Sequence, residues 1–145
     1  MTVLKLYSMP VVRVDGKKRG YILAVMNAGG EILLKCADEN EREFFINPRS
    51  IVRTGGEIVF DRECKREPHA APLRLNAPCF DGQGNYIGAF EDCALKNYAL
   101  KTFLIGGKRY PAERVAAGDV LILRDKSDAP AAIAAKDLFL SAVMS

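Results

Sequence analysis

The sequence has little of what metal and catalytic centres require. It contains one histidine, no tryptophan and four cysteines, and no two cysteines form a Cys-x-x-Cys pair. Structural zinc sites take four ligands that usually come in close pairs. The only imidazole is that of His69, and the thiols that it would have to join are far apart: Cys36, Cys64, Cys79 and Cys93. We therefore expect no metal site, and free thiols as in a reducing compartment.

Long hydrophobic runs are also missing. No apolar stretch approaches the roughly 20 residues that cross a bilayer as a helix. The first residues, MTVLKLYSMP, show no charged stretch followed by an apolar core, so they do not resemble a signal peptide. These two features predict a cytoplasmic protein without a membrane span.

Charge of one sign is not concentrated in any segment. The net charge is +3. Residues 1–61 carry nine basic and eight acidic side chains, and residues 73–125 carry seven and six. A domain that binds nucleic acid usually has a strongly basic composition. Linear composition therefore does not indicate a nucleic-acid groove, although folding can still bring cations together.

Motifs that carry chemistry are absent as well. The glycine pairs fit neither a dinucleotide-binding nor a phosphate-binding loop. Residues 81–92 alternate polar side chains as a calcium loop does, but Tyr86 stands at the sixth position, where that loop needs glycine. His69 lies near Glu67 in a charged segment, without the pocket that a general base requires. We predict no catalytic residue, no cofactor and no enzyme activity.

What the sequence does contain is an internal repeat. PVVRVDGKKRG begins at Pro10 and PCFDGQGNYIG begins at Pro78, and the glycines at positions 20 and 88 then coincide without a gap. Further along, FFINPRSIVRTGGEIVF (44–60) matches RYPAERVAAGDVLIL (109–123). In this match Ile51 corresponds to Val115. So many matches in the same order indicate two copies of one structural unit.

Both copies are rich in β-branched and aromatic residues, and glycines interrupt them at short intervals, which is typical of short antiparallel strands. We expect strands in the first copy near 3–6, 10–14, 20–27, 31–37, 43–46 and 57–60. In the second copy we expect them near 73–75, 78–81, 86–94, 99–105, 108–111 and 120–123. Closing each sheet removes its exposed edges, so each copy should form a small β-barrel. Units of this size bury little apolar surface, so the two barrels should pack together.

The repeat divides the chain into four parts. The first barrel occupies residues 1–61, a charged and Pro-bounded linker 62–72, the second barrel 73–125 and a helical tail 126–145. In the tail, Asp128 is a candidate N-cap and Pro130 suits a first turn, so a helix is predicted over 129–144. This helix could seal a barrel end or the groove between the barrels, or it could bind a partner.

The two copies resemble the PRC-barrel family. The motifs are MPVVRVDGKKRGYILAV with INPRSIVRTGGEIVF, and APCFDGQGNYIGAF with YPAERVAAGDVLIL. The resemblance covers 4–60 and 73–124 and implies an all-β fold of two tandem PRC-type β-barrels, packed together, with a short C-terminal helix. Members of the family include the cytoplasmic domain of a photosynthetic reaction-centre H subunit and the C-terminal domain of a bacterial ribosome-maturation factor. In these proteins the barrel is a binding and scaffolding module, and the family implies no shared catalytic residue.

Two functions remain open at this point. The first is a non-enzymatic scaffold that binds a protein partner or another copy of itself. The alternative is an RNA- or ribosome-associated factor that contacts phosphates through cations without sequence preference. The candidate contacts with a partner or RNA are Lys17, Lys18, Arg19, Lys108 and Arg109.

Overall fold

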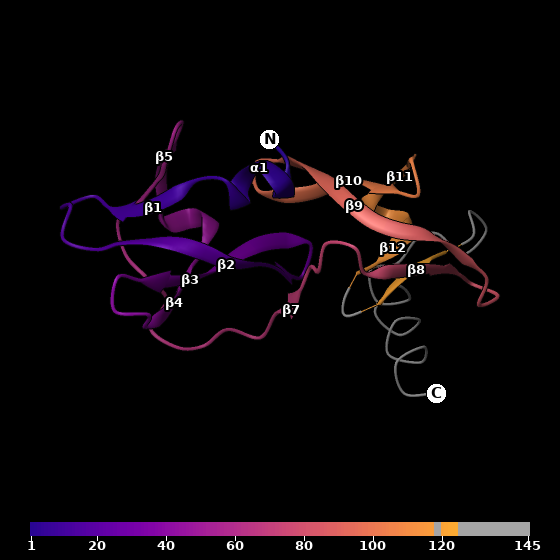
Figure 1. The fold of residues 1–145 in the computed structure, drawn as a ribbon, viewed down its shortest axis with the longest axis horizontal. Coiled ribbons are helices and arrows are strands. Elements are labelled where there is room, and N and C mark those ends of the chain that lie inside the picture. The colour runs from indigo at the N-terminus through magenta and orange to yellow at the C-terminus, as the bar shows by residue number, and fades with distance from the viewer. Residues whose placement is uncertain (118–119, 125–145) are drawn as a thin grey trace. The chain divides into compact units, whose positions relative to one another are not determined.

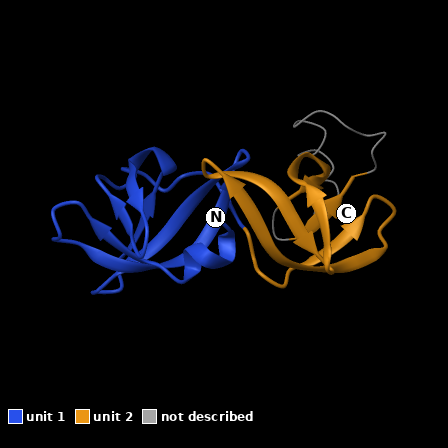
Figure 2. Cartoon of the chain, turned by 90° about the horizontal axis from the view of Figure 1, so that it is seen from above, with its two compact units in different colours: residues 1–72 blue, residues 73–145 orange. Residues whose placement is uncertain are grey.

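The computed structural model describes residues 1–117 and 120–124, and most of these residues lie in short β-strands (Figure 1). The all-β class expected from the sequence is therefore confirmed. The chain divides into two compact units, Met1–Pro72 and Leu73–Ser145, which Figure 2 shows in blue and orange. Among the described residues, no helix combines the length and apolar character needed to cross a membrane.

The first unit begins with a short helix, followed by an antiparallel meander that a parallel strand extends. Its elements are α1 (Val3–Tyr7), β1 (Pro10–Arg13), β2 (Arg19–Ala28), β3 (Glu31–Asp38), β4 (Glu43–Ile46), the 3-10 turn η1 (Pro48–Ser50), β5 (Ile51–Thr54), β6 (Ile58–Phe60) and β7 (Ala71–Pro72). The strands follow the order β3-β2-β1-β6-β5, with β4 paired to β3 and β7 paired to β2. Strand β1 is antiparallel to β2 but parallel to β6, so the end of the unit returns to its beginning.

The second unit repeats this scheme. Its elements are β8 (Pro78–Asp81), β9 (Tyr86–Lys96), β10 (Ala99–Ile105), β11 (Lys108–Pro111), the 3-10 turn η2 (Ala112–Arg114), β12 (Val115–Ala116) and β13 (Leu121–Leu123). The order is β12-β13-β8-β9-β10, and β11 pairs with β10. Strand β8 is antiparallel to β9 and parallel to β13, as β1 is to β2 and β6.

The repeat extends to individual pairs of residues. The equivalent pairs are Val11–Ile58 and Cys79–Leu121 in the parallel ladders, Val11–Gly20 and Cys79–Gly88 in the hairpins, and Ile51–Phe60 and Val115–Leu123 in the antiparallel ladders that follow. These registers confirm the match of Pro10 with Pro78 and of Gly20 with Gly88 that the sequence predicts. The internal repeat is therefore a property of the strand pairing as well as of the sequence.

Gly20 and Gly88 occupy the repeated positions because the backbone passes too closely for a side chain. A Cβ at Gly20 would overlap the carbonyl oxygen of Ala37 on β3. A Cβ at Gly88 would lie 2.6 Å from the Cα of Gly106, and Gly88 has a φ of 141°. Only glycine tolerates both the contact and a φ in this range without strain.

Each unit has an apolar core built around a pair of aromatic rings. Phe44 and Phe60 pack with ring centroids 5.6 Å apart in the first unit, and Phe90 and Phe103 do so at 5.5 Å in the second. Three of these four rings are fully buried, and that of Phe44 is nearly so. Tilted pairs at this distance contribute stability beyond the apolar area that they bury.

The N-terminal prediction of a strand over 3–6 is wrong, because residues Val3–Tyr7 form α1. The side chain of Thr2 caps this helix by accepting a hydrogen bond from the Lys5 amide at 3.1 Å. The predicted strand near 73–75 is also absent. In turn, the sequence interpretation missed the short strands β5 and β12, which follow the two 3-10 turns.

Closure of each unit differs from the expected barrels. Within the described ranges, 1–117 and 120–124, the strand order of the first unit ends at β5 and β4, and hydrogen bonds do not join these two strands. Part of the gap is bridged by the segment that follows β6, because the Asp61 amide donates to Ser50 and the Cys64 amide donates to Phe45. The sheet is therefore not a fully closed barrel.

The segment expected to be a linker, 62–72, is hydrogen-bonded to the first unit at both ends. Cys64 contacts β4 as described, and Ala71 and Pro72 form β7, which pairs with Asn27 and Met26 of β2. The helix predicted over 129–144 lies outside the described residues.

Candidate functional site

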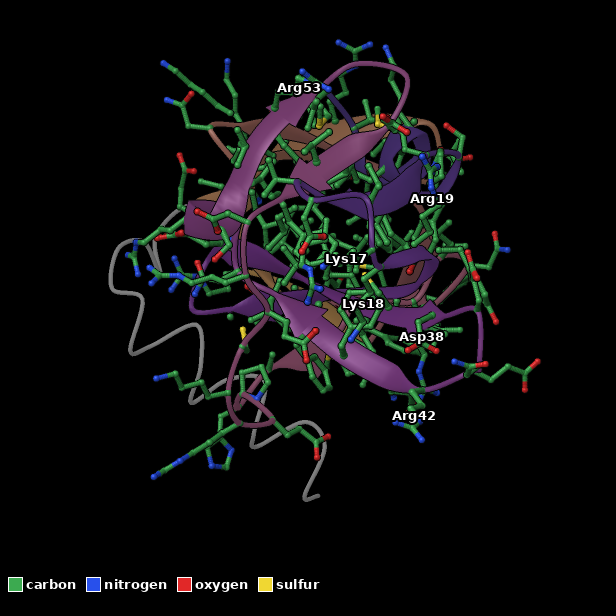
Figure 3. The ribbon with its side chains drawn as sticks, turned by 90° about the vertical axis from the view of Figure 1, so that its left-hand side faces the viewer. Lys17, Lys18, Arg19, Asp38, Arg42 and Arg53 are labelled. Atoms are coloured by element: carbon green, nitrogen blue, oxygen red, sulfur yellow. The ribbon has the colours of Figure 1, made fainter. Side chains whose placement is uncertain are left out.

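Three charged segments meet at one end of the sheet in the first unit. Strands β1 and β3 end there, β2 and β4 begin there, and β6 ends there because it runs parallel to β1. The turn between β1 and β2, the turn between β3 and β4 and the segment after β6 therefore lie together. Figure 3 views the molecule from this side and labels charged residues of the two turns.

The first segment, residues 13–19, is called the basic turn here, because it holds four basic side chains and one acidic one. Its shape depends on Asp15, whose Oδ1 accepts a hydrogen bond from the Lys17 amide at 2.9 Å and pairs with Nε of Arg13 at 3.0 Å. These contacts hold the pKa of the Asp15 carboxyl below its usual value, with the Arg13 hydrogen bond as the largest cause. The side chains of Lys17 and Arg19 are exposed and form no ion pair with any described residue.

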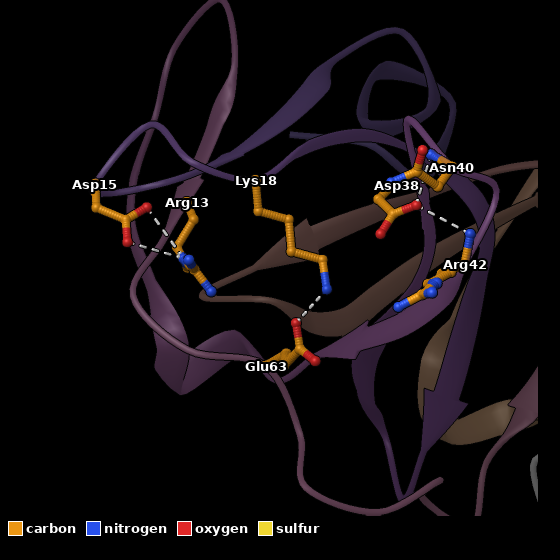
Figure 4. A network of polar contacts seen from close by, with 7 residues as sticks. All are labelled: Arg13, Asp15, Lys18, Asp38, Asn40, Arg42 and Glu63. Atoms are coloured by element: carbon orange, nitrogen blue, oxygen red, sulfur yellow. Dashed lines mark hydrogen bonds and ion pairs between the residues drawn. The ribbon is translucent and has the colours of Figure 1, made fainter.

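Lys18 differs from its neighbours because the protein already neutralises it. Its Nζ lies 2.6 Å from Oε2 of Glu63 and 4.2 Å from the centroid of the Phe44 ring, as Figure 4 shows for the ion pair. The Lys18 side chain is only 20% exposed. Lys18 therefore attaches the segment after β6 to the first unit and is less available to a partner than Lys17 or Arg19.

The second segment, residues 38–43, is called the acidic turn here, because it holds four acidic side chains and one basic one. Oδ1 of Asp38 accepts hydrogen bonds from the Asn40 amide at 2.9 Å and the Arg42 amide at 3.0 Å. The bond from Arg42 is the largest cause of the lowered pKa of the Asp38 carboxyl, and the charge of Lys18 adds to it. Glu39 and Glu41 are exposed, and neither forms an ion pair within the described part of the chain.

The charges at this end of the sheet balance in total but are segregated by segment. The segment after β6, residues 61–67, carries three basic and three acidic side chains. The basic turn has a formal charge of +3 and the acidic turn one of −3. The two turns are neighbours, because Gly20, next to Arg19, pairs with Asp38 across β2 and β3. This surface thus has two poles and is not a uniformly basic patch.

A second feature lies on the outer face of the same sheet. Paired residues form one row across four strands, namely Arg19 on β2, Val12 on β1, Val59 on β6 and Arg53 on β5. The two valines are buried, each with 5% of its surface exposed, while the two arginines are exposed and form no ion pair with described residues. Tyr21, two residues after Arg19 on the same strand, is 50% exposed. The row and Tyr21 form what is called the outer face below.

The remaining predicted contacts, Lys108 and Arg109, lie in the second unit. They begin β11 and pair with Ile105 and Leu104 of β10 across the two-residue turn of Gly106 and Gly107. Both side chains are exposed, and no described residue forms an ion pair with either. The strands predicted near 99–105 and 108–111 are therefore confirmed, and they form a hairpin.

The thiols are poorly suited to chemistry. Cys36, Cys79 and Cys93 are buried, and none of the four cysteines forms a disulfide. Burial raises the pKa of Cys36 to about 12, that of Cys79 to about 11 and that of Cys93 to about 12. A protonated thiol is a poor nucleophile and a poor metal ligand. Among the described residues, no group of three or more histidine, cysteine or acidic side chains is arranged to hold a metal ion.

Three members of this site were not predicted from the sequence: Glu63, Arg42 and Arg53. Glu63 lies 45 residues from Lys18, so no local pattern connects them. Arg42 closes a DENER stretch, whose polar and mostly acidic composition resembles an ordinary solvated turn. Arg53 belongs to β5, a strand that the sequence interpretation missed. Its alignment with Arg19 depends on the register of three strand pairs.

Comparison with known proteins does not assign the chain to a family: a scan against protein-family models found no match, and a search of curated proteins found no significant match.

Proposed function

We propose that the chain is a non-enzymatic binding or scaffolding protein of the cytoplasm, built from two tandem PRC-like β-units, which acts through protein–protein interaction. The shared strand registers support the duplication. The sequence motifs that resemble the PRC-barrel family lie in the paired strands and in the glycine positions 20 and 88. The four free cysteines fit a reducing compartment.

The observation that carries the protein-binding role is the outer face. Arg19 and Arg53 lie on either side of two buried valines, and half of Tyr21 is exposed beside them. Arginine and tyrosine are enriched at protein interfaces, where they combine apolar area with directed hydrogen bonds. Neither arginine has an ion pair among the described residues, so both can bind carboxylates of a partner.

The test is a pull-down from native cell extract with the full chain immobilised, with and without nuclease. We expect discrete proteins to be retained after nuclease treatment, and Arg53→Glu to reduce their retention. Lys101→Glu is a matched control, because Lys101 is also an exposed cation on a strand but lies on β10. If retained proteins vanish with nuclease, or if the Arg53 and Lys101 variants behave alike, the outer face is not the binding surface.

RNA binding is the second candidate, and the exposed cations Lys17, Arg19, Lys108 and Arg109 favour it. It ranks second because the sheet end that holds the first two cations also holds as many acidic as basic side chains. We expect weak binding to a single-stranded RNA oligonucleotide, which moderate salt abolishes because contacts with phosphate release counterions. Fluorescence anisotropy over a salt series measures this, and tight, salt-resistant binding would place RNA first.

A further inference from the structure

The turns between the first two strands of each unit are equivalent but carry different charges. Comparing them shows which charged side chains the fold requires. In the second unit the β8–β9 turn, residues 81–86, contains a single charged residue, Asp81. Oδ1 of Asp81 accepts hydrogen bonds from the Gln83 and Asn85 amides, both at 2.9 Å, and Gly84 has a φ of 86°. The basic turn also combines an aspartate acceptor with a glycine of positive φ, because Oδ1 of Asp15 accepts the Lys17 amide and Gly16 has a φ of 74°. Arg13 and Lys18 have partners within the first unit, whereas Lys17 and Arg19 form no ion pair among the described residues. The fold therefore does not account for the last two cations.

The acidic turn also carries more acidic side chains than its shape requires. Asp38 shapes the turn by accepting the Asn40 and Arg42 amides, and Glu43 pairs with Lys35 at 3.2 Å. Glu39 and Glu41 take no part in these contacts and are exposed. The basic turn therefore presents two exposed cations without an ion pair, and the acidic turn presents two such anions. Arg42 is a third exposed cation, on the acidic turn, and no ion pair joins the two turns among the described residues.

A surface with adjacent positive and negative poles is complementary to a copy of itself. A twofold axis between the poles brings the basic turn of each copy onto the acidic turn of the other, since a symmetric dimer uses the same patch twice. Lys17 and Arg19 of one copy then face Glu39 and Glu41 of the second, and the same contacts recur on the other side of the axis. Val14, at the tip of the basic turn, is 61% exposed and adds apolar area.

We propose that the protein forms a symmetric dimer through this end of the first unit, with the basic turn of each copy on the acidic turn of the other. The inference rests on the proposed function and specifies one partner of the chain, a second copy. An RNA or an acidic protein would match only one of the two poles and would meet repulsion at the other. A second copy matches both.

Salt dependence is the first consequence. Exposed ion pairs are individually weak, so the dimer should be reversible and dependent on protein concentration. Raising the salt concentration from about 0.1 M to about 1 M reduces the Debye length from about 10 Å to about 3 Å, so the dissociation constant should rise. A dimer held by apolar contact alone would not weaken in this way.

The decisive experiment is a charge swap on the full chain, followed by sedimentation velocity. One variant carries Lys17→Glu and Arg19→Glu, and the other carries Glu39→Lys and Glu41→Lys. Each variant alone brings like charges together, so dimerisation should weaken at least about tenfold. The two variants mixed in equal amounts restore both complementary contacts, so a heterodimer should form with close to the wild-type dissociation constant.

Matched controls separate the surface from general charge and folding effects. Lys96→Glu with Lys101→Glu reverses two exposed cations on β9 and β10 and should leave the dissociation constant unchanged. Circular dichroism and thermal melting check that each variant is folded, and Lys17→Glu alone is the fallback if the double variant unfolds. Because the mixture restores association only through the two named turns, a folding defect cannot imitate a positive result.

Some outcomes would overturn the proposal. The proposal is wrong if the wild-type chain stays monomeric at all concentrations in low salt, or if it grows into open-ended oligomers. It is also wrong if the charge reversals do not change the dissociation constant, or if the two variants mixed together fail to associate. The nuclease pull-down tells this failure from that of the proposed function when it uses the wild-type chain and the Glu39→Lys, Glu41→Lys variant, which leaves Arg19 and the rest of the outer face unchanged. If the wild-type chain is monomeric but still retains other proteins, only the dimer is wrong. If it neither dimerises nor retains protein, both are wrong.

Discussion

The two units share one pairing scheme, but the turn between their first two strands holds four basic side chains in the first unit and none in the second. The β1–β2 turn reads VDGKKRG and the β8–β9 turn reads DGQGNYIG, and both reverse the chain with an aspartate acceptor and a glycine of positive φ. The comparison shows which residues the fold needs, namely the glycines and the apolar strand positions. Lys17 and Arg19 are additions that the fold does not require, and they are therefore the residues to test for function.

The largest effect is expected in the cores. Phe60→Ala and Phe90→Ala each remove a fully buried ring and should lower the free energy of unfolding by about 3–5 kcal/mol. Units this small are marginal alone, so we expect one cooperative transition that both variants shift. Urea denaturation followed by circular dichroism measures this. Val52→Ala, at a side chain that is 57% exposed, is the control. Two transitions, each shifted by one variant only, would show that the units unfold independently.

The next largest loss of stability is expected at the repeated glycines, Gly20 and Gly88. Alanine at Gly20 or Gly88 must displace the neighbouring backbone, and at Gly88 it must also adopt a φ of 141°. Overpacking should lower the stability of Gly20→Ala by about 1–3 kcal/mol, and the added backbone strain should make the loss larger in Gly88→Ala. Gly55→Ala is the matched control, because a Cβ there meets nothing within 4 Å. If Gly20→Ala melts at the temperature of this control, the two strands do not cross as closely as described.

A smaller effect on stability is expected at Lys18 of the first unit. Lys18→Met keeps the aliphatic stem but removes the charge that contacts both Glu63 and the Phe44 ring. We expect a loss of about 1 kcal/mol relative to wild type. High salt should reduce this difference, because it screens the ion pair of the wild-type protein. Arg49→Met is the control. It removes an ion pair with Glu31 that is 3.8 Å long, and because the Arg49 side chain is 78% exposed, the effect on stability should be near zero. Equal melting temperatures for the two variants would mean that Lys18 does not hold the segment after β6.

The cysteines provide a comparison within the core. Burial raises the pKa of Cys36 and Cys93 to about 12 each, against about 8.5 for an unfolded thiol. Above that lower value the unfolded chain loses these protons while the folded chain keeps them, so stability should fall as the pH rises from about 9 to about 12. Cys93→Ala should reduce this slope in denaturation series at several pH values. A slope that is unchanged would mean that Cys93 titrates normally in the folded protein.

Thiol titration tests the same burial more simply. At pH 8 a thiol reagent should modify Cys64 first, because the other three thiols are buried. After denaturation four thiols should react, because none is in a disulfide. Rapid modification of Cys36, Cys79 or Cys93 in the native protein would contradict the described core.

The repeated strands could be predicted because their residues have a strong local pattern. The bounds of 43–46, 78–81, 99–105 and 108–111 agree with β4, β8, β10 and β11. The residues of α1, VLKLY, predict a strand because valine and leucine suit a strand as well as a helix, and the helix cap depends on the single side chain of Thr2. Lys17 and Arg19 were found because they belong to a run of cations. The outer face depends on long-range strand registers, which no local pattern encodes.

The parallel pairing of β1 with β6 has a consequence for how the chain is synthesised. Val11 contacts Ile58, so the first strand must wait until the sixth has left the ribosome before its second edge is filled. A non-local pairing of this kind slows folding, because the intervening loop must close before the contact forms. Until then β1 exposes one unpaired edge, which can pair with another nascent chain. The second unit meets the same delay, because β8 waits for β13. A translating polysome would therefore hold this protein in a state that chaperones recognise, for the time that it takes to make some 50 residues.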